Sequence, residues 1–260
     1  MRLTGEIVLV TGGGSGIGQG IARRFAAEGA VVIVADKVEE RAVTTARTIR
    51  ADGGEAMPLP LDVTVESDVV AAFERLTRDL GPITILVNNA GLSVGADVAR
   101  LTSADWDRNF DVVIKAAFLC SRAVLPTMIE ARRGVILNIA SVNGMFGIGE
   151  DAYSAAKAGL LNLTQNMAMR YGKNGIRVNA ISPGTIRTPI WDERLARDPH
   201  VFDSLNAWYA LGRVGEVKDV TNAALFLCSS EASWITGVNL PVDGGLTAGS
   251  VQMIDDLGGG

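Results

Sequence analysis

The chain has 260 residues, 48% of them hydrophobic and 20% charged, which is typical of a packed globular protein and excludes a disordered or fibrous class. Its 24 basic and 29 acidic residues give a net charge of −5 without a basic run, so we expect no nucleic-acid partner. Cys120, Cys228 and His200 are too widely spaced for a zinc site, and we expect no metal.

The first predicted element is an apolar strand, residues 7–10, which is too short for a signal sequence or a membrane span. We therefore expect a cytoplasmic protein without a membrane partner. From there β-branched runs alternate with longer amphipathic stretches. We predict strands at 7–10, 31–34, 55–61, 83–87, 134–140, 177–181 and 238–242. We predict helices at 17–28, 39–52, 67–80, 103–131, 151–171 and 217–229.

This rhythm predicts one α/β domain over residues 1–260, a doubly wound, Rossmann-like parallel sheet of about seven strands flanked by helices. Residues 185–215 interrupt it, because they lack clear periodicity and are rich in aromatic side chains, among them Trp191, Phe202 and Trp208. Long irregular segments in compact domains often cover a ligand. We interpret this segment as a substrate lid within the domain.

A glycine-rich loop, Thr11 to Gly18, joins the first strand to the first helix. Its glycines allow a tight turn and let a pyrophosphate approach the backbone amides, while the start of the helix offers free N–H groups and a positive dipole end. Such a loop alone is also compatible with a flexible turn. Its place between a strand and a helix favours a dinucleotide site.

The second strand leads to Asp36, about 20 residues past the glycines. A carboxylate at this place can accept hydrogen bonds from both hydroxyls of an adenosine ribose, and it repels a 2′-phosphate. Asp36 therefore favours NAD over NADP, although Lys37 beside it can partly offset the repulsion and leave some NADP use. A solvated, helix-capping Asp36 is the alternative interpretation.

Tyr153 and Lys157 are four residues apart on a predicted helix, so their side chains project from one face, one turn apart. A phenol with a pKa of about 10 exchanges protons poorly at neutral pH, and a nearby ammonium group together with an oxidised nicotinamide would lower that pKa. This spacing also arises by chance on many helices. The dinucleotide loop upstream raises it to a predicted proton-transfer pair.

Several separated motifs together resemble those of the short-chain dehydrogenase/reductase family, over residues 6–245. They are Thr11 to Gly18, Asp62-Val63, Asn88 to Gly91, Ser141 with Tyr153 and Lys157, Asn179 to Gly184, and Val242 to Gly245. The resemblance implies an NAD-dependent oxidoreductase that interconverts a secondary alcohol and a ketone by hydride transfer. It assigns Ser141 to bind the substrate oxygen, Tyr153 to move the proton, and Lys157 to bind the nicotinamide ribose.

The resemblance also assigns residues to the cofactor. Asp62 and Val63 would hold the adenine ring, and residues 179–184 together with Ile186 and Thr188 would orient the nicotinamide amide. The predicted cofactor-binding set is Gly12, Ser15, Gly16, Ile17, Gly18, Asp36, Asp62, Val63, Asn89, Ala90, Gly91, Tyr153, Lys157, Pro183, Gly184, Ile186 and Thr188.

One position departs from the family's pattern. The family usually places an asparagine, the fourth member of a catalytic tetrad, where this chain has Val113. Valine offers no side-chain hydrogen bond, so a proton relay that uses this position would be slower or rerouted. Asn109, one helical turn earlier, is a possible substitute, with an exposed or capping asparagine as the more ordinary interpretation.

By the resemblance, the substrate pocket is formed by Ser93, Val94, residues 143–148, Ile190, Trp191 and Trp208. Most of these are apolar, which favours a medium-sized, partly hydrophobic alcohol or ketone, with a cyclic one among the options. Glu150 can bind hydroxyls or a basic substrate, although an acidic residue that opens a helix more often serves the helix dipole.

Helices 103–131 and 151–171 form the main subunit contact in this family. With exposed apolar side chains expected at Val124, Met128, Leu161 and Met167, we expect a homotetramer, with a dimer as the alternative. Two alternatives remain for the function. One is an NADPH-dependent 3-ketoacyl-type reductase, which Asp36 opposes, and the other is a non-catalytic NAD-binding regulatory homologue, which the intact catalytic residues oppose.

Overall fold

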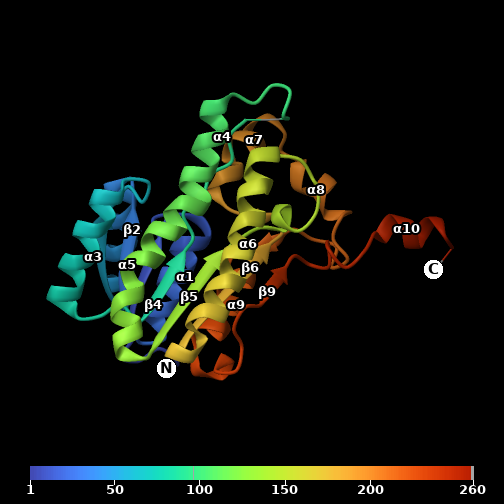
Figure 1. The fold of residues 1–260 in the computed structure, drawn as a ribbon. Helices are drawn as coiled ribbons and strands as arrows, with labels where there is room; N and C mark the ends of the chain where they lie inside the picture. The colour runs from blue at the N-terminus through green and yellow to red at the C-terminus, as the bar shows by residue number, and fades with distance from the viewer. Residues whose placement is uncertain (96, 259–260) are drawn as a thin grey trace.

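A computed structural model describes residues 1–95 and 97–258 of the chain (Figure 1). Seven strands form one sheet in the order β3-β2-β1-β4-β5-β6-β9, and every neighbouring pair is parallel. The strands are β1 (Ile7–Thr11), β2 (Val31–Asp36), β3 (Glu55–Pro60), β4 (Ile85–Asn88), β5 (Gly134–Ile139), β6 (Ile176–Pro183) and β9 (Asn239–Val242). The predicted Rossmann-like, doubly wound sheet is confirmed.

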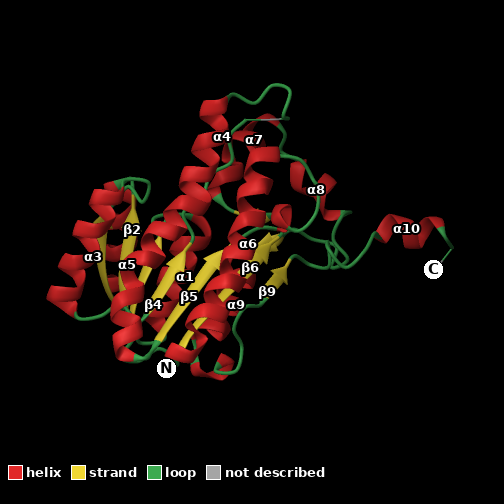
Figure 2. Cartoon of the chain, viewed as in Figure 1, coloured by secondary structure: helices red, strands yellow, loops and turns green. Residues whose placement is uncertain are grey.

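Helices cover both faces of the sheet, as the yellow strands between red helices in Figure 2 show. One face carries α1 (Gly16–Ala27), α2 (Glu39–Ala51) and α9 (Val217–Cys228). The other carries α3 (Glu66–Leu80), α5 (Ala116–Ala131) and α6 (Asp151–Tyr171). Along β1, Val8 and Val10 pack toward α1 while Leu9 packs toward α3 and α5, because successive strand side chains point to opposite faces.

The order of the strands creates the place for a ligand. β1 pairs with β2 on one side and with β4 on the other, so the chain leaves β1 and β4 toward opposite faces of the sheet. Loops that diverge in this way open a crevice at the carboxyl ends of the two strands, the usual ligand position in open α/β sheets.

The predicted helix 103–131 contains an irregularity. It consists of α4 (Ser103–Phe110), the π-helix η1 (Asp111–Lys115) and α5, and within residues 1–95 and 97–258 it is the helix long and apolar enough to cross a membrane. The most apolar 18-residue stretch of this helix has a mean hydropathy of 1.7, and half of it is buried in the protein. Buried Leu119 and Cys120 pack against the sheet, as in a core helix. Single π-turns inside α-helices are frequent at functional sites.

The lid predicted at 185–215 is more regular than its sequence indicates. It contains β7 (Ile186–Arg187), α7 (Asp192–Arg197) and α8 (Val201–Asn206), and β7 pairs with β8 (Gly215–Glu216) in a separate two-stranded sheet. The short α10 (Val251–Asp256) projects from the body near the C-terminus (Figure 1).

The side chains expected on exposed helix faces need correction. Val124, Met128 and Met167 are buried, and Leu161 is half-buried. The first three belong to the core between the helices and the sheet. The periodicity of an apolar helix marks a buried face but does not say whether the sheet or another subunit covers it.

Candidate functional site

A cleft of about 1300 Å³ lies at the carboxyl ends of the strands. It brings together residues that are far apart in the sequence and that the motifs single out. Its lining includes Gly12, Ser15, Gly16, Ile17, Asp36, Asp62, Val63, Asn89, Ala90, Gly91, Ser141, Tyr153, Lys157, Pro183, Gly184, Ile186 and Thr188. Of the predicted catalytic and cofactor-binding residues, only Gly18 is missing from this lining.

Gly18 has a packing role beneath the loop. A Cβ atom at this position would lie 2.3 Å from the Gly12 carbonyl oxygen and 2.4 Å from Nδ2 of Asn89. Asn89 Nδ2 itself donates to the carbonyl oxygens of Thr11 (2.9 Å) and Gly12 (3.2 Å), so the loop is tied to the end of β4. Only glycine permits this close approach of helix α1 to the loop.

The loop leaves a cradle for an anion. Gly12 and Gly16 have φ values of 61° and 52°, in the left-handed region that favours glycine. The side chain of Ser15, the N-cap residue of α1, makes no capping hydrogen bond, so the first-turn N–H groups of the helix remain available. Thr188 lies across the loop, since a Cβ at Gly16 would be 3.3 Å from its Cγ2. This cradle fits a pyrophosphate between loop and lid.

Asp36 is 8% exposed at the end of β2. Its carboxylate accepts hydrogen bonds from the N–H groups of Gly14 (3.0 Å) and Val38 (2.9 Å), which fix its orientation at the cleft wall. The alternative of a solvated Asp36 is wrong. Lys37, in turn, forms an ion pair with Asp62 at 2.6 Å rather than approaching Asp36 as a free cation.

Asp62 is charged at neutral pH. Burial works to raise the pKa of its carboxyl group, but hydrogen bonds from Lys37 and Thr64 prevail and hold the pKa below its ordinary value. One basic residue of this region escaped the sequence analysis. Arg41 of α2 lines the same end of the cleft, and it is exposed. Its position depends on how α2 packs beside the glycine loop, which no motif encodes.

Within the predicted proton-transfer pair, Lys157 is buried and Tyr153 is half-buried. Lys157 is 3% exposed, its Nζ donates to the Ile139 carbonyl oxygen at 2.6 Å, and it lies 5.5 Å from the centroid of the Tyr153 ring. Burial lowers the pKa of Lys157 to about 7. An ammonium group has three donors, so this geometry leaves donors for a ribose.

Burial is also the largest influence on the pKa of Tyr153. It raises the pKa of the half-buried Tyr153 to about 12, a hydrogen bond with Ser141 works to lower that pKa, and the charge of Glu150 raises it. The expected lowering of the pKa of Tyr153 by Lys157 does not occur, because removal from water disfavours the charged forms of both groups.

Ser141 is 8% exposed and lies two residues after the end of β5. Its Oγ donates to Oδ1 of Asn143 at 2.9 Å and accepts from the Asn143 backbone N–H at 3.2 Å. Ser141, Tyr153 and Lys157 thus converge on one wall of the cleft, from the end of β5 and the first two turns of α6. A hydroxyl or carbonyl oxygen placed there meets two hydroxyl groups backed by a buried amine.

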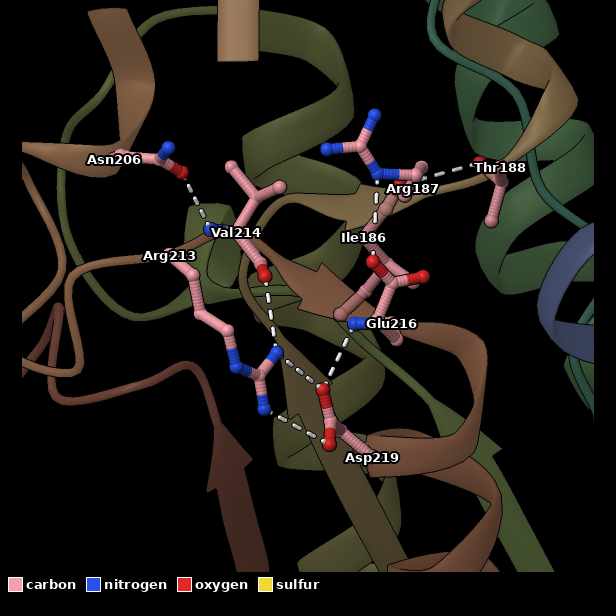
Figure 3. Close-up of polar contacts among 8 residues, drawn as sticks. All are labelled: Ile186, Arg187, Thr188, Asn206, Arg213, Val214, Glu216 and Asp219. Atoms are coloured by element: carbon pink, nitrogen blue, oxygen red, sulfur yellow. Dashed lines mark hydrogen bonds and ion pairs between the residues drawn. The ribbon is translucent and has the colours of Figure 1, made fainter. Parts of the chain in front are cut away.

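The lid is fixed at its base, as Figure 3 shows. Arg213 binds Asp219 through two hydrogen bonds, at 2.8 and 3.2 Å, and Arg187 pairs with Glu216 at 3.4 Å across β7 and β8. Asn206 Oδ1 accepts from the Val214 N–H at 2.9 Å. The lid also has a small apolar core of its own, made of Val201, Phe202, Tyr209 and Val214.

Ile190 and Trp191 of the lid line the cleft, as expected. Trp208 does not line it, and 66% of its surface is exposed, so its expected place in the pocket is wrong. Ser93 lines the cleft, whereas its neighbour Val94 does not. The ordering of the lid depends on contacts between residues distant in the sequence, which the spacing of its aromatic residues does not reveal.

Val113 packs inside an apolar cluster with Ala117, Ala156 and Leu160, against which Tyr153 also packs. Asn109 is neither exposed nor a capping residue, which corrects the ordinary interpretation. It is fully buried, and its Nδ2 donates to the carbonyl oxygens of Val94 and Asp105, both at 2.8 Å. This asparagine therefore anchors the loop that follows β4.

The chain is similar to several known proteins. Residues 12–247 match a family model described as enoyl-(acyl carrier protein) reductase. An uncharacterized oxidoreductase of Schizosaccharomyces pombe is 42% identical over 99% of this chain and 96% of its own length. Meso-2,3-butanediol dehydrogenase of Serratia marcescens is 37% identical over 97% and 98%. A solved oxidoreductase of the short-chain dehydrogenase/reductase family from Burkholderia thailandensis has a TM-score of 0.91 at 39% identity, with 98% of each chain covered.

Proposed function

Because the chain belongs to the short-chain dehydrogenase/reductase family of oxidoreductases, we propose that it interconverts a secondary alcohol and a ketone with NAD(H). The observation that carries this proposal is the convergence of Ser141, Tyr153 and Lys157 on one wall of a cleft that also contains an anion cradle. The Serratia relative, whose name assigns it a small diol, supports an alcohol as the substrate class.

The proposal of NAD rests on Asp36. Two backbone N–H groups orient its carboxylate at the cleft wall, where it would accept hydrogen bonds from an adenosine ribose and would repel a 2′-phosphate. When bound, the nicotinamide supplies or accepts the hydride. Lys157 would bind the nicotinamide ribose, and Asp62 and Val63 would hold the adenine.

In the proposed reaction, Tyr153 Oη takes the hydroxyl proton of the alcohol during oxidation and returns it to the ketone oxygen during reduction. Ser141 Oγ binds the same oxygen and keeps it beside the phenol. In its protonated form, Lys157 would favour the phenolate at the moment when the proton leaves the tyrosine, since charges interact strongly in a low-dielectric site.

The direct test is Tyr153→Phe, assayed on a panel of secondary alcohols and ketones with both nucleotides. We expect the variant to lose turnover by about 10²-fold or more, because the proton carrier is removed while the ring is retained. Ser204→Ala, in α8 and away from the cleft lining, is the matched loss of a hydroxyl. A Tyr153→Phe variant as active as the wild type would refute the catalytic assignment.

The cofactor proposal has its own test. A fluorescence titration should show tighter binding of NADH than of NADPH, and Asp36→Ala should reduce the difference. Equal or tighter binding of NADPH in the wild type would favour the rival proposal, an NADPH-dependent 3-ketoacyl-type reductase. That rival draws on the reductase description of the family model and on Arg41, a cation able to meet a 2′-phosphate.

We further propose a cytoplasmic homotetramer. The support for an oligomer is the long helix Ser103–Ala131. The monomer buries only half of its most apolar 18-residue stretch, and Phe118 is 44% exposed. Sedimentation velocity on the purified chain tests this proposal, and a monomer at micromolar concentration would oppose it.

A further inference from the structure

Glu150 adopts an unusual backbone conformation directly before the helix that carries Tyr153. Its φ of 55° and ψ of 59° are left-handed, which is costly for a residue with a side chain. The turn is nevertheless well held. Ser154 Oγ donates to the Gly149 carbonyl oxygen at 2.6 Å, and the Ser154 N–H donates to the Glu150 carbonyl oxygen at 2.8 Å. The Glu150 side chain makes no capping bond to α6 and lines the cleft instead.

Two polar side chains from other segments hold this carboxylate. Ser93 Oγ, after β4, donates to Oε1 at 2.8 Å, and Asn143 Nδ2, after β5, donates to Oε2 at 3.2 Å. A carboxylate has about four acceptor positions, so two are still free. Within residues 1–95 and 97–258, no lysine, arginine or histidine lies in ion-pair distance of Glu150. The ordinary expectation, an acid that serves only the helix dipole, does not describe this side chain.

The carboxylate lies close to the atoms proposed to react. Asn143 connects it to Ser141, because Oδ1 of the same carboxamide accepts from Ser141 Oγ at 2.9 Å. One carboxamide with its two hydrogen bonds therefore separates Glu150 from Ser141 Oγ, the hydroxyl proposed to bind the substrate oxygen. The negative charge of Glu150 also contributes to the raised pKa of Tyr153, as expected for a near neighbour.

We propose that Glu150, held by Ser93 and Asn143, binds a second hydroxyl group of the substrate, one or two carbons from the reacting carbon. The substrates are then diols and hydroxyketones rather than simple alcohols and ketones. This inference rests on the proposed function, since Ser141 and Tyr153 must bind the first oxygen.

The surroundings favour a hydroxyl over an ammonium group as the occupant. Two donors already offset part of the negative charge on Glu150, and the apolar side chains Ile148, Ile190 and Trp191 line the same cleft. A neutral donor on a compact carbon skeleton suits such a wall, since it completes the carboxylate's hydrogen bonds without carrying a full positive charge out of water.

The test compares cyclohexane-1,2-diol with cyclohexanol, two rings that differ by one hydroxyl group. We expect wild-type kcat/KM to favour the diol by roughly tenfold or more, the size of one hydrogen bond to a charged group. In Glu150→Ala the ratio should fall to near one, and in Glu150→Gln, which keeps a neutral acceptor, it should fall part of the way. The ratio is the right measure, because any change at Tyr153 affects both alcohols alike.

Glu193→Gln on the lid is the matched control. Its side chain is 88% exposed, pairs with Arg197 and does not line the cleft, so the ratio should stay at the wild-type value. A diol preference that survives in Glu150→Ala would overturn the inference, as would a preference for 2-aminocyclohexanol over the diol. Oxidation of cyclohexanol by the wild type without a diol preference overturns the second-hydroxyl site alone. Oxidation of neither alcohol, with NAD⁺ or NADP⁺, overturns the proposed function as well.

Discussion

Replacing Lys157 by methionine should make the protein more stable at neutral pH and at the same time inactive. In the folded protein burial lowers the pKa of this lysine from its ordinary 10.5 to about 7. The unfolded chain returns the amine to water. At pH 7 the unfolded chain holds a proton on this amine, and folding must either release that proton or bury its charge. This cost lowers the free energy of unfolding, and Lys157→Met removes it.

The sign follows from the two pKa values. Between pH 7 and pH 10.5 the unfolded chain binds a proton that the folded protein does not, so wild-type stability rises with pH in this window. The full difference corresponds to about 5 kcal/mol, at about 1.4 kcal/mol for each pH unit. The stability advantage of Lys157→Met should be largest near pH 7 and below, and should shrink by about 2 kcal/mol between pH 7 and pH 9.

Loss of the Nζ–H···O bond to Ile139 subtracts about 1 kcal/mol from the advantage at every pH and leaves the slope unchanged. Urea unfolding at pH 7 and pH 9, with equal protein concentrations, measures the free energy of unfolding of both proteins. Lys173→Met, at an exposed position, is the control whose difference from the wild type should not vary with pH. A Lys157→Met advantage that is constant with pH would show that the folded protein keeps the lysine charged.

Three further outcomes can be checked. Val113→Asn places a carboxamide in an apolar cluster and should lower the free energy of unfolding by about 1–3 kcal/mol in a denaturation assay, without raising kcat. Asn109→Ala leaves the backbone of Val94 without its partner, so thermal unfolding should show a loss of about 1–3 kcal/mol and steady-state kinetics a higher KM. Because burial and Glu150 raise the pKa of Tyr153 to about 12, kcat/KM for alcohol oxidation should increase from pH 6 to pH 9, while that for ketone reduction should stay level because the phenol keeps its proton over this range; an oxidation rate that declines would contradict the role of the phenol.

The sheet was predictable from the sequence because each strand is a short, nearly continuous apolar run bounded by turns. Burial on both faces demands such runs, and their order along the chain fixes the doubly wound class. The convergence of Asp36, Ser141 and Tyr153 at one edge follows from the same logic, since the carboxyl ends of parallel strands and the helix after β5 meet there.

Features that depend on tertiary packing could not be predicted from the sequence. Helical periodicity predicts an exposed face for the buried side chains of Val124 and Met128, because it does not distinguish a sheet from a subunit partner. The burial of Asn109 arises from its contacts with a loop fifteen residues earlier in the chain. The left-handed turn at Glu150 could not be read from composition, since most residues with this conformation are glycine or asparagine.

The clearest example of this limit is the proton-transfer pair itself. Sequence spacing correctly suggests that Tyr153 and Lys157 share a helix face, and a charge-only argument then makes each stabilise the ionised form of the other. The folded protein adds desolvation, which disfavours both charged forms. It raises the pKa of the phenol to about 12 and lowers the pKa of the amine to about 7. This balance keeps the proton on the tyrosine at neutral pH. In the proposed reaction the tyrosine would therefore need further partners in the cleft to release its proton, and the free energy that burial of Lys157 costs is the quantity that the methionine variant measures.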